Sequence, residues 1–494
     1  MKRRLFSIVA GALFIGFALL IPMISIPKLG ISWDEPFQRH YGDVITRWIT
    51  EQDPQLYQDS ERYYGPLVPT LLYIPEAMGW TTDPIAIYEI RHWINWAIFL
   101  TAIPFTFLLS RRAGLPRHWS LVSAAVLMTT PVIAGHGLFN SKDIPFLTIC
   151  LTSTWLWCWY LDNMSLKRAL ILGIGFGIAL LSRINAMNVI ALLLLVGITI
   201  RRPSLRELST LIATTLGTTI VCYVGWPTLW HNPWVEFKTA VITMANYPWS
   251  GYVLFNGELI SAQHLPWTYI PVWIGITLNP IAIAIFISSC LYGLYTIPRW
   301  IRTPNLALSL VGAISVIPIG IGILTEITFY DSWRHLFFVY PGLLILSVYG
   351  LSRIISLIPK GGVLGLGIGI IYAITTAITW ATYFPYVHCY LNSFAGPRES
   401  IIYNWEMDYW GVSYRELLTQ IPAAAILPEN LPASANIELV PLPKRSQFTV
   451  VNTPDSATLF ITNHRLRRGP LPYPKAGEIS RDGFPLATAY RLKP

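Results

Sequence analysis

Charged residues are scarce in this sequence: they occupy 12% of its 494 positions, whereas hydrophobic residues occupy 53%. Soluble domains carry roughly 25% charged residues, so the composition excludes an ordinary soluble protein and predicts a chain that crosses a membrane several times. The net charge of +9 does not indicate a nucleic-acid partner. The basic residues instead form short clusters between apolar segments, which is typical of residues that orient membrane spans.

Other missing features narrow the chemistry further. The five cysteines form no CxxC pair and no Cys/His spacing of the zinc type, which argues against a disulfide framework or a structural zinc site. The sequence has no G-x-x-x-x-G-K-[ST] loop, so ATP hydrolysis has no support. It also has no internal repeat and no low-complexity tract.

Long apolar runs are what the sequence has instead. About 20 apolar residues cross a bilayer, and this length predicts about 11 transmembrane helices. The predicted spans are residues 5–26, 92–110, 119–135, 145–161, 169–182, 186–200, 207–225, 268–296, 305–324, 336–352 and 363–384. The fifth and sixth are short, which leaves open a single kinked pair. We expect the first to be a retained anchor, because Pro22 and Pro27 replace the small residues of a signal-peptide cleavage site.

Basic connectors between the spans predict the orientation. If Lys2–Arg4 lies in the cytoplasm, every other short basic connector falls on the same side, as the positive-inside rule requires. These connectors hold Arg111, Arg112, Arg117, Lys167, Arg168, Arg201, Arg202, Arg206, Arg299, Arg302, Arg353 and Lys360. They are too short to bind a nucleotide sugar, so a donor for chemistry on the outer side is expected to be a phosphate carried by a lipid.

Three outer regions are larger than connectors: residues 27–91, residues 226–267, which are rich in Trp, Pro and Asn as loops at headgroup level are, and the tail from residue 385. Segment 27–91 mixes apolar and polar residues with three tryptophans, as interfacial helices do. From residue 385 the spans stop, and strand-like runs such as "ANIELVPL", "SQFTVV" and "ATLFITNHRL" follow. The predicted fold is therefore an all-α polytopic membrane module over residues 1–384, with a small α/β extracytoplasmic domain over residues 385–494.

The stretch "GISWDEPFQRHYGD", residues 30–43, places Asp34 and Glu35 directly after the first span. A helix start accounts for part of this pattern, with Ser32 or Asp34 as the cap and Pro36 in the first turn. A cap needs only one side chain, however, and this site offers two carboxylates. A partly desolvated carboxylate can act as a general base toward a hydroxyl.

Three further outer segments bring charge to the same side of the membrane. "GHGLFNSKDIPF", residues 135–146, holds Lys142 and Asp143, and "LSRIN", residues 181–185, holds Arg183. "YDSWRHLFFVYPG", residues 330–342, holds Asp331, Arg334 and His335. A helix cap at Asp143, a snorkelling arginine and a structural Asp–Arg pair are the alternatives. Lysine and arginine at these positions would suit a phosphate group. "NWEMDYWG", residues 404–411, is expected to dock the tail on the bundle.

In combination these motifs resemble the integral-membrane GT-C glycosyltransferases that use polyprenyl-phosphate sugars, the superfamily of protein O-mannosyltransferases and bacterial lipid A aminoarabinose transferases. The acidic pair, "FNSKDIPF", "DSWRHLFFVYPG" and "NWEMDYWG" carry the resemblance, and in topology it extends over nearly the whole chain. It implies an inverting transfer in which Asp34 accepts the proton of the acceptor. Glu35 would position or share that role, and Asp143 would bind the acceptor or organise the site.

The resemblance also implies partners. The donor would be a polyprenyl-phosphate-linked sugar, and the candidates to bind its phosphate, chosen by charge and side, are Lys142, Arg183, Arg334 and His335. A divalent cation is left open as a cofactor, because some relatives with paired acids use one, but the sequence shows no firm ligand set. The acceptor is left open among a glycan, a lipid and a protein. The implied location is the plasma (inner) membrane.

Three other classes of protein compete with this interpretation. A lipid-linked glycan polymerase or ligase would share the outer carboxylates and cations. A lipid-linked sugar flippase or transporter predicts ionisable residues deep within spans and related halves, whereas the charges here lie at span ends. A non-enzymatic receptor or assembly factor would concentrate its charged groups in the tail.

Overall fold

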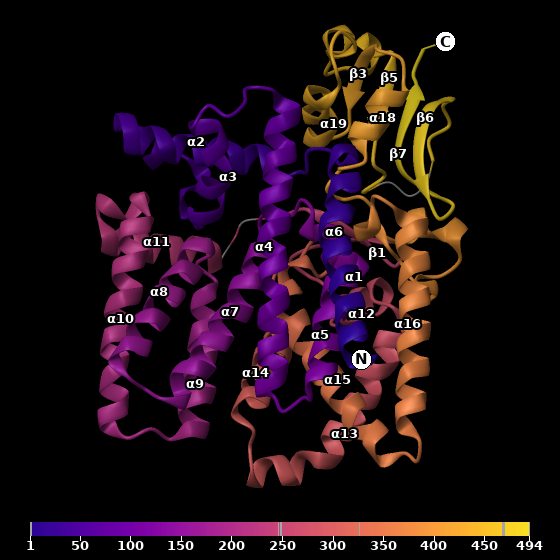
Figure 1. The fold of residues 1–494 in the computed structure, drawn as a ribbon. Helices are drawn as coiled ribbons and strands as arrows, with labels where there is room; N and C mark the ends of the chain where they lie inside the picture. Colours follow the sequence, from indigo (N-terminus) through magenta and orange to yellow (C-terminus); the bar gives the residue numbers. More distant parts are fainter. Residues whose placement is uncertain (1, 246, 248, 326, 467–469, 494) are drawn as a thin grey trace.

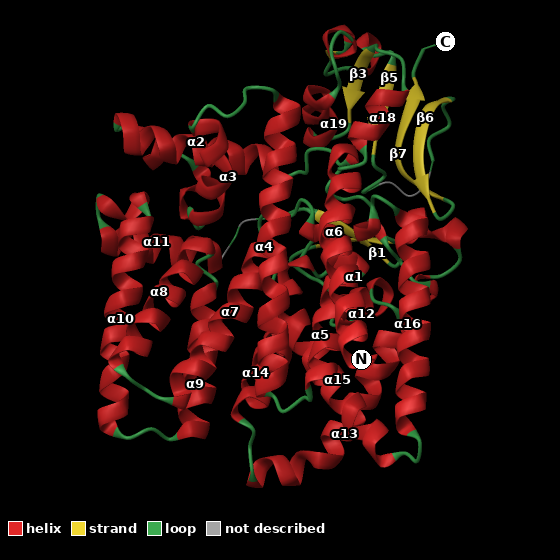
Figure 2. Cartoon of the chain, viewed as in Figure 1, coloured by secondary structure: helices red, strands yellow, loops and turns green. Residues whose placement is uncertain are grey.

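The computed structural model describes residues 2–245, 247, 249–325, 327–466 and 470–493. Helices form a bundle, and a small sheet domain built from the C-terminal residues sits on one end of it (Figure 1). Strands are confined to this domain and to one short hairpin, β1 (Tyr252–Phe255) and β2 (Glu258–Ser261), in the described part of the chain (Figure 2). We call the end of the bundle next to the sheet domain the domain-bearing end.

Helices cover all the predicted spans. They are α1 (Lys2–Ser25), α4 (Pro84–Arg112), α5 (Arg117–Thr129) with α6 (Pro131–Gly137), α7 (Asp143–Asp162), α8 (Leu166–Ser182), α9 (Ala186–Arg201), α10 (Leu205–Gly225), α12 (Tyr269–Thr277) with α13 (Pro280–Arg302), α14 (Leu306–Leu324), α15 (Tyr340–Leu357) and α16 (Gly361–Tyr383). The predicted helical membrane fold is confirmed.

Proline interrupts two of the predicted spans. Pro131 begins α6, and the α5–α6 pair bends by 64°. Pro280 begins α13 after a break at Leu278 and Asn279. Proline has no N–H to continue a preceding helix but suits the first turn of a new one, so each proline divides one apolar run into two helices.

Helix length and composition, taken over the described residues alone, identify the most apolar of the predicted spans. By length and composition, seven of the described helices qualify, or eight if α5 and α6 form one span. The apolar runs at 169–182 and 186–200 fold as two separate helices, α8 and α9, rather than one kinked pair. These have 17 and 16 residues, which is shorter than the roughly 20 residues needed to cross the hydrocarbon core without tilt or thinning.

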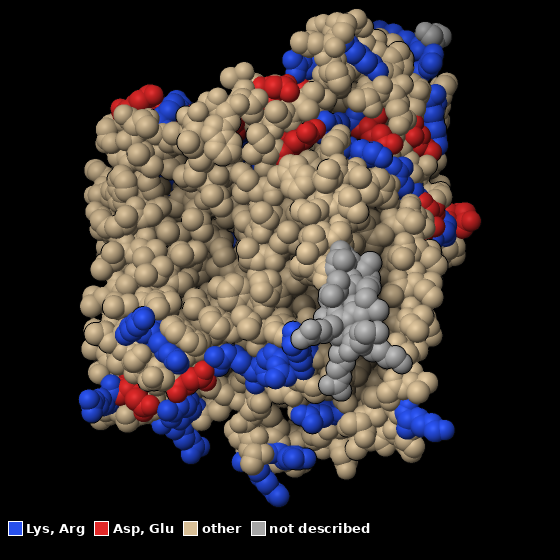
Figure 3. Space-filling view, viewed as in Figure 1, with Lys and Arg blue, Asp and Glu red and all other residues tan. Residues whose placement is uncertain are grey.

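Charge is distributed in bands along the bundle axis. On the face shown in Figure 3, lysine and arginine gather at the end opposite the sheet domain, and a broad belt without charged residues separates them from the domain-bearing end. Arg111 and Arg112 end α4, Arg201 ends α9, and Arg299 and Arg302 lie in the last turn of α13. Such a belt matches the hydrocarbon core of a bilayer.

Segment 27–91 forms two helices that lie across the domain-bearing end, α2 (Glu35–Glu51) and α3 (Leu67–Ala77) (Figure 1). A further helix at this end, α11 (Pro233–Ala245), follows α10. The tail adds three short helices, α17 (Ile401–Asn404), α18 (Tyr414–Gln420) and α19 (Leu431–Ala435).

The C-terminal sheet has the strand order β4-β3-β5-β7-β6. Its strands are β3 (Ala425–Pro428), β4 (Thr449–Val450), β5 (Leu459–Thr462), β6 (Lys475–Arg481) and β7 (Phe484–Arg491). β3 pairs in parallel with β4 and β5, and β7 pairs antiparallel with β5 and β6. The β6–β7 hairpin was not predicted, although its turn at Asp482 and Gly483 adopts positive φ and carries the Asp-Gly signal of such turns.

One strand prediction in this domain is wrong. Residues 435–442 form the end of α19 and a single-turn 3-10 helix, Asn436–Leu439, instead of a strand. The Asn430 side chain accepts the Ala433 amide and so starts α19, and Asn436 is buried against the chain that follows the first helix. Local capping and a tertiary contact therefore outweigh the β propensity of the run.

Candidate active site

The segment that precedes Asp34 is fixed by the C-terminal domain. The Ile31 amide donates to Asn436 Oδ1 at 2.8 Å, and Asn436 Nδ2 donates back to the Ile31 carbonyl at 2.9 Å. The Trp33 amide donates to the Trp410 carbonyl at 3.1 Å. These contacts between distant parts of the sequence determine where Asp34 enters the site.

Asp34 occupies the cap position of α2, with Pro36 in the first turn as expected, but its side chain makes no capping hydrogen bond. Its Oδ1 lies 3.4 Å from Lys142 Nζ, and 16% of the side chain is exposed. Capping therefore does not explain this carboxylate, which faces a cation and stays in contact with solvent.

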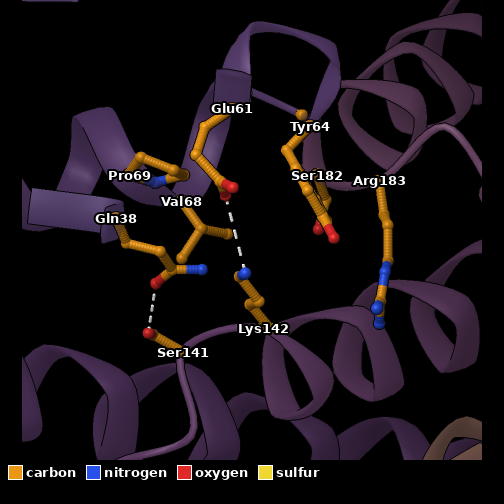
Figure 4. A pocket seen from close by; sticks show the side chains of 10 residues that line it. Gln38, Glu61, Tyr64, Val68, Pro69, Ser141, Lys142, Ser182 and Arg183 are labelled. Atoms are coloured by element: carbon orange, nitrogen blue, oxygen red, sulfur yellow. Dashed lines mark hydrogen bonds and ion pairs between the residues drawn. The ribbon is translucent and has the colours of Figure 1, made fainter. Parts of the chain in front are cut away.

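Lys142 joins the first outer segment to the second. Its ammonium lies 3.6 Å from Glu61 Oε2 and 4.5 Å from the centre of the Tyr64 ring. Figure 4 shows the lysine directed toward Glu61, with Arg183 across the same small cavity. Burial alone would lower the pKa of Lys142, but Asp34 and Glu61 raise it above its ordinary value, so the lysine remains charged.

Asp143 is the first residue of α7, yet it does not cap this helix. Asn140 Oδ1 accepts the Asp143 amide at 2.8 Å and performs that role. The Asp143 carboxylate instead receives Arg183 Nη1 at 2.8 Å and Arg334 Nη1 at 2.9 Å. The buried Asp143 carboxylate therefore holds two of the predicted cations, Arg183 and Arg334, in place. Such ion pairs tolerate burial because each charge lies next to an opposite one.

Arg334 lies at the centre of the cluster, in a single 3-10 turn, Arg334–Val339, that leads into α15. Its guanidinium lies 4.8 Å from the centre of the Tyr330 ring and 5.0 Å from that of Trp410. It also donates to Asp331 Oδ2 at 3.0 Å, so the expected Asp–Arg pair is present. His335 packs beside it, with its ring centre 4.6 Å from that of Tyr330.

Glu35 points elsewhere. It is 1% exposed, lies 3.0 Å from His92 Nε2 on α4, and accepts the Ser32 amide at 2.8 Å. Burial would raise the pKa of Glu35, but His92, Arg91 and the Ser32 amide together lower it. The two neighbouring carboxylates therefore have different surroundings: Asp34 faces the cluster and Glu35 ties α2 to α4.

Sequence reasoning missed Glu61, Tyr64 and Arg465 as members of the cluster. Glu61 stood in the acid-rich first loop without a motif around it, and Arg465 follows a strand of the tail. The Arg465 guanidinium forms ion pairs with Asp331 and, at 3.4 Å, with Glu406 Oε1. No local signal in the sequence places this residue in contact with the second half of the bundle.

The paired acids of the first outer segment are held by separate partners. Asp34 and Glu35 face different partners, Lys142 and His92, and so do not form a common ligand set. His388, Cys389 and Asp408 are the only His/Cys/Asp/Glu group of metal-binding geometry in the described ranges. Asp408 accepts hydrogen bonds from His388 Nε2 and from three backbone amides of the turn at 411–413. These bonds anchor the turn, and the group confirms neither a metal nor a cofactor.

Two cavities have different chemistry. The polar one, between Lys142 and Arg183, has a volume of about 20 Å³, enough for roughly one water molecule. The other has a volume of about 550 Å³ and is lined by predominantly apolar side chains of α5, α12, α13, α14, α15 and α16.

Comparison with known proteins identifies structures that share this fold. No protein-family model matches the sequence, and no curated protein matches it significantly. ArnT from Cupriavidus metallidurans in the apo state matches 99% of this chain and 98% of its own, with 12% identity and a TM-score of 0.50. The same protein bound to undecaprenyl phosphate matches 97% of each chain, with 14% identity and a TM-score of 0.51.

The archaeal oligosaccharyltransferase of Archaeoglobus fulgidus matches 91% of this chain and 62% of its own, with 12% identity and a TM-score of 0.46. The likeness to ArnT extends over nearly the full length of both proteins. The chain therefore has the fold of ArnT, and the predicted GT-C type of membrane fold is confirmed.

Proposed function

We propose that this protein is an inverting glycosyltransferase that moves a sugar from a polyprenyl-phosphate donor to a hydroxyl or amine of an acceptor. One observation carries the proposal. At the domain-bearing end, a partly exposed carboxylate, Asp34, lies next to a cluster of cations, Lys142, Arg183 and Arg334, that other carboxylates hold in place. Phosphoryl leaving groups need such cations, and an attacking hydroxyl needs such a carboxylate.

The cations would stabilise the leaving group. Lys142 and Arg183 are both partly exposed and face one polar cavity. They can therefore reach a phosphate while Arg334 keeps its contacts with the rings of Tyr330 and Trp410. The cavity is too small for a sugar phosphate, so donor binding requires Lys142 to exchange Asp34 and Glu61 for the phosphate oxygens. That exchange would also free Asp34 to act as a base.

The reaction balances with this chain's own groups. The acceptor oxygen or nitrogen attacks the anomeric carbon and transfers its proton to Asp34. The bond between that carbon and the phosphate oxygen breaks on the opposite face, and the polyprenyl phosphate leaves with the bonding electrons. Asp143 would position Arg183 and Arg334, Glu35 would position α2, and His335 would line the phosphate side. Cations fixed before the reaction lower the barrier more than mobile ones.

The membrane setting follows from the charge bands. We place the basic end in the cytoplasm and the domain-bearing end outside the plasma (inner) membrane, because basic residues favour the cytoplasmic side. The apolar cavity of about 550 Å³ has the chemistry to hold a hydrocarbon chain. ArnT, which shares the fold, has been observed with undecaprenyl phosphate bound, and this supports a lipid-linked donor for the present chain.

The test is turnover by the purified full-length protein. Labelled undecaprenyl-phosphate sugars would be supplied with a membrane extract as acceptor, and release of undecaprenyl phosphate would be measured. We expect Asp34→Asn to fold and to be slower by about a hundredfold or more, which is the range of a lost general base. The matched control is Asp83→Asn, because Asp83 caps α4 through the Ile85 amide and lies outside the cluster.

Equal turnover of Asp34→Asn and the parent would contradict the assigned base. If the parent released no lipid phosphate from any of these donors, the proposal would fail as a whole. A lipid-linked glycan polymerase or ligase would then be tested next with lipid-diphosphate glycans.

A further inference from the structure

A single arginine of the C-terminal domain reaches the candidate active site. Arg465 lies just after β5 (Leu459–Thr462), yet its guanidinium pairs with Asp331, which belongs to the bundle. Asp331 in turn accepts Arg334, and Arg334 donates to Asp143 at 2.9 Å. An uninterrupted series of oppositely charged groups therefore runs from the tail to the carboxylate that holds the site's cations.

The second contact of Arg465 is with Glu406, whose side chain is buried and whose Oε1 lies 3.4 Å from Arg465 Nε. The other oxygen, Oε2, is buried without a hydrogen-bond partner among the described residues. A buried carboxylate needs a compensating partner, so Glu406 and Arg465 stabilise one another, and the guanidinium is bound by two carboxylates, Glu406 and Asp331.

The third contact reaches the other half of the site. The Arg465 guanidinium lies 5.6 Å from the centre of the Trp33 ring, and Trp33 immediately precedes Asp34. Arg465 therefore touches both segments that supply the proposed reaction, the one that ends in Asp34 and the one that holds Arg334. Its planar, five-donor group suits several simultaneous contacts in a way that lysine does not.

We propose that Arg465 is a positioning residue, through which the C-terminal domain sets the distance between the Asp34 segment and the Arg334 segment. This inference rests on the proposed function for its effect on turnover, but not for its effect on structure. Without Arg465, Asp331 loses one of its two cations and the turn at 331–335 is held only from the bundle side.

The first test follows structure alone. Hydrogen exchange of the backbone would be measured by mass spectrometry over residues 329–339 in the full-length parent, Arg465→Gln and a matched control, Arg415→Gln. Arg415 also joins the C-terminal domain to the bundle, through Glu89 at 2.8 Å and the Leu29 carbonyl at 3.1 Å, but among the described residues it forms no ion pair with a member of the cluster. We expect at least fivefold faster exchange over 329–339 in Arg465→Gln and no change there in Arg415→Gln.

Unchanged exchange in Arg465→Gln, or an equal increase in both variants, would overturn the inference. If Arg465→Gln does not fold, Arg465→Lys takes its place: the ammonium can reach only one of its two carboxylates, so a smaller increase confined to 329–339 is expected, and none would count against the proposal.

The second test uses turnover with an undecaprenyl-phosphate sugar. Arg465→Gln should lower kcat/KM about tenfold or more, Arg465→Lys should recover at least a third of the loss, and Arg415→Gln should match the parent. No recovery by lysine, or equal losses in both glutamine variants, would indicate a general loosening of the domain. A parent without turnover would remove the proposed function, whereas the exchange result would still decide the positioning role.

Discussion

Asp34 and Glu35 show how adjacent residues separate into different roles. Successive side chains at the start of a helix point about 100° apart, so one of them can face the cluster while the other enters the protein. Asp34 meets Lys142 at the surface of the site, and Glu35 is buried against His92. The doublet that drew attention in the sequence is thus one candidate base and one structural contact.

The first prediction concerns Glu35. Because its pKa is lowered in the folded protein, it stabilises the fold above its ordinary pKa, and that stabilisation is lost as pH falls. Glu35→Gln should therefore destabilise the protein by about 1–3 kcal/mol at pH 7, the usual cost of disrupting a buried charged hydrogen bond. Thermal unfolding at pH 7 and at about pH 3, below the ordinary pKa of a glutamate, measures this, with the exposed Glu51→Gln on the same helix as control. A Tm equal to that of the parent at pH 7 would contradict the assignment.

The second prediction concerns Glu406, whose pKa shifts on folding in the opposite direction to that of Glu35. Burial raises the pKa of Glu406 to about 8, although Arg465 acts against this. A carboxyl whose pKa is raised on folding loses stability as pH rises from its unfolded value toward the folded one. The parent should therefore lose thermal stability between about pH 5 and pH 8, and Glu406→Gln should lose less over the same interval. Parallel Tm profiles for the two proteins would show that Glu406 does not titrate in this range.

At the level of elements, the site is held by close contacts between backbone segments. Gly65, in the loop before α3, packs on the end of α8, where an added Cβ would lie 2.2 Å from the Leu181 carbonyl and 2.4 Å from that of Ser182. Tyr64 and Arg183, the neighbours on either side of this contact, both face the polar cavity. The contact therefore sets the width of the cavity between the first loop and the α8–α9 turn.

The third prediction follows from this contact. Gly65→Ala must push backbone against backbone, so we expect a loss of about 1–3 kcal/mol, as for other overpacked sites, together with roughly tenfold lower turnover because misplaced groups lose their alignment. Gly312→Ala on α14 is the control, since an added Cβ there meets nothing within 4 Å. Turnover of Gly65→Ala equal to the parent's would show that the cavity width is not set here.

At the level of the whole molecule, the arrangement of charge relative to the bundle decides how the protein sits in a membrane. The domain-bearing end carries the sheet domain, while lysine and arginine gather at the opposite end, among them the residues that end α4 and α13 (Figure 3). Under the proposed orientation, a donor for chemistry at the domain-bearing end would have to reach it through the bilayer.

The fourth prediction tests this orientation. In a Cys290→Ser background, a cysteine at Ser446 in the sheet domain should react with a membrane-impermeant maleimide in right-side-out vesicles. A cysteine at Ser356, near the end of α15, should react only after the vesicles are opened. Both serines are exposed in the fold. The reverse labelling pattern would invert the proposed topology, because a retained permeability barrier admits the reagent to one side only.

The order of the amino acids was sufficient for the membrane class, the positions of the apolar helices, and the candidates Asp34, Lys142, Asp143, Arg183 and Arg334, because hydrophobic length and charge placement are local properties of a chain. It failed where a proline divided an apolar run, as at Pro131 and Pro280, and where a buried asparagine outweighed strand propensity, as at Asn436.

Only the folded chain shows which charges meet. Glu35 and Asp34 are one residue apart yet have different partners, whereas Arg465 lies 134 residues from Asp331 and pairs with it. Ion pairs of this kind depend on how helices and the sheet domain pack, and that packing joins segments whose local sequences carry no mark of their partner. The sequence therefore indicates the cations of the candidate site, whereas the tertiary structure determines which carboxylates bind them.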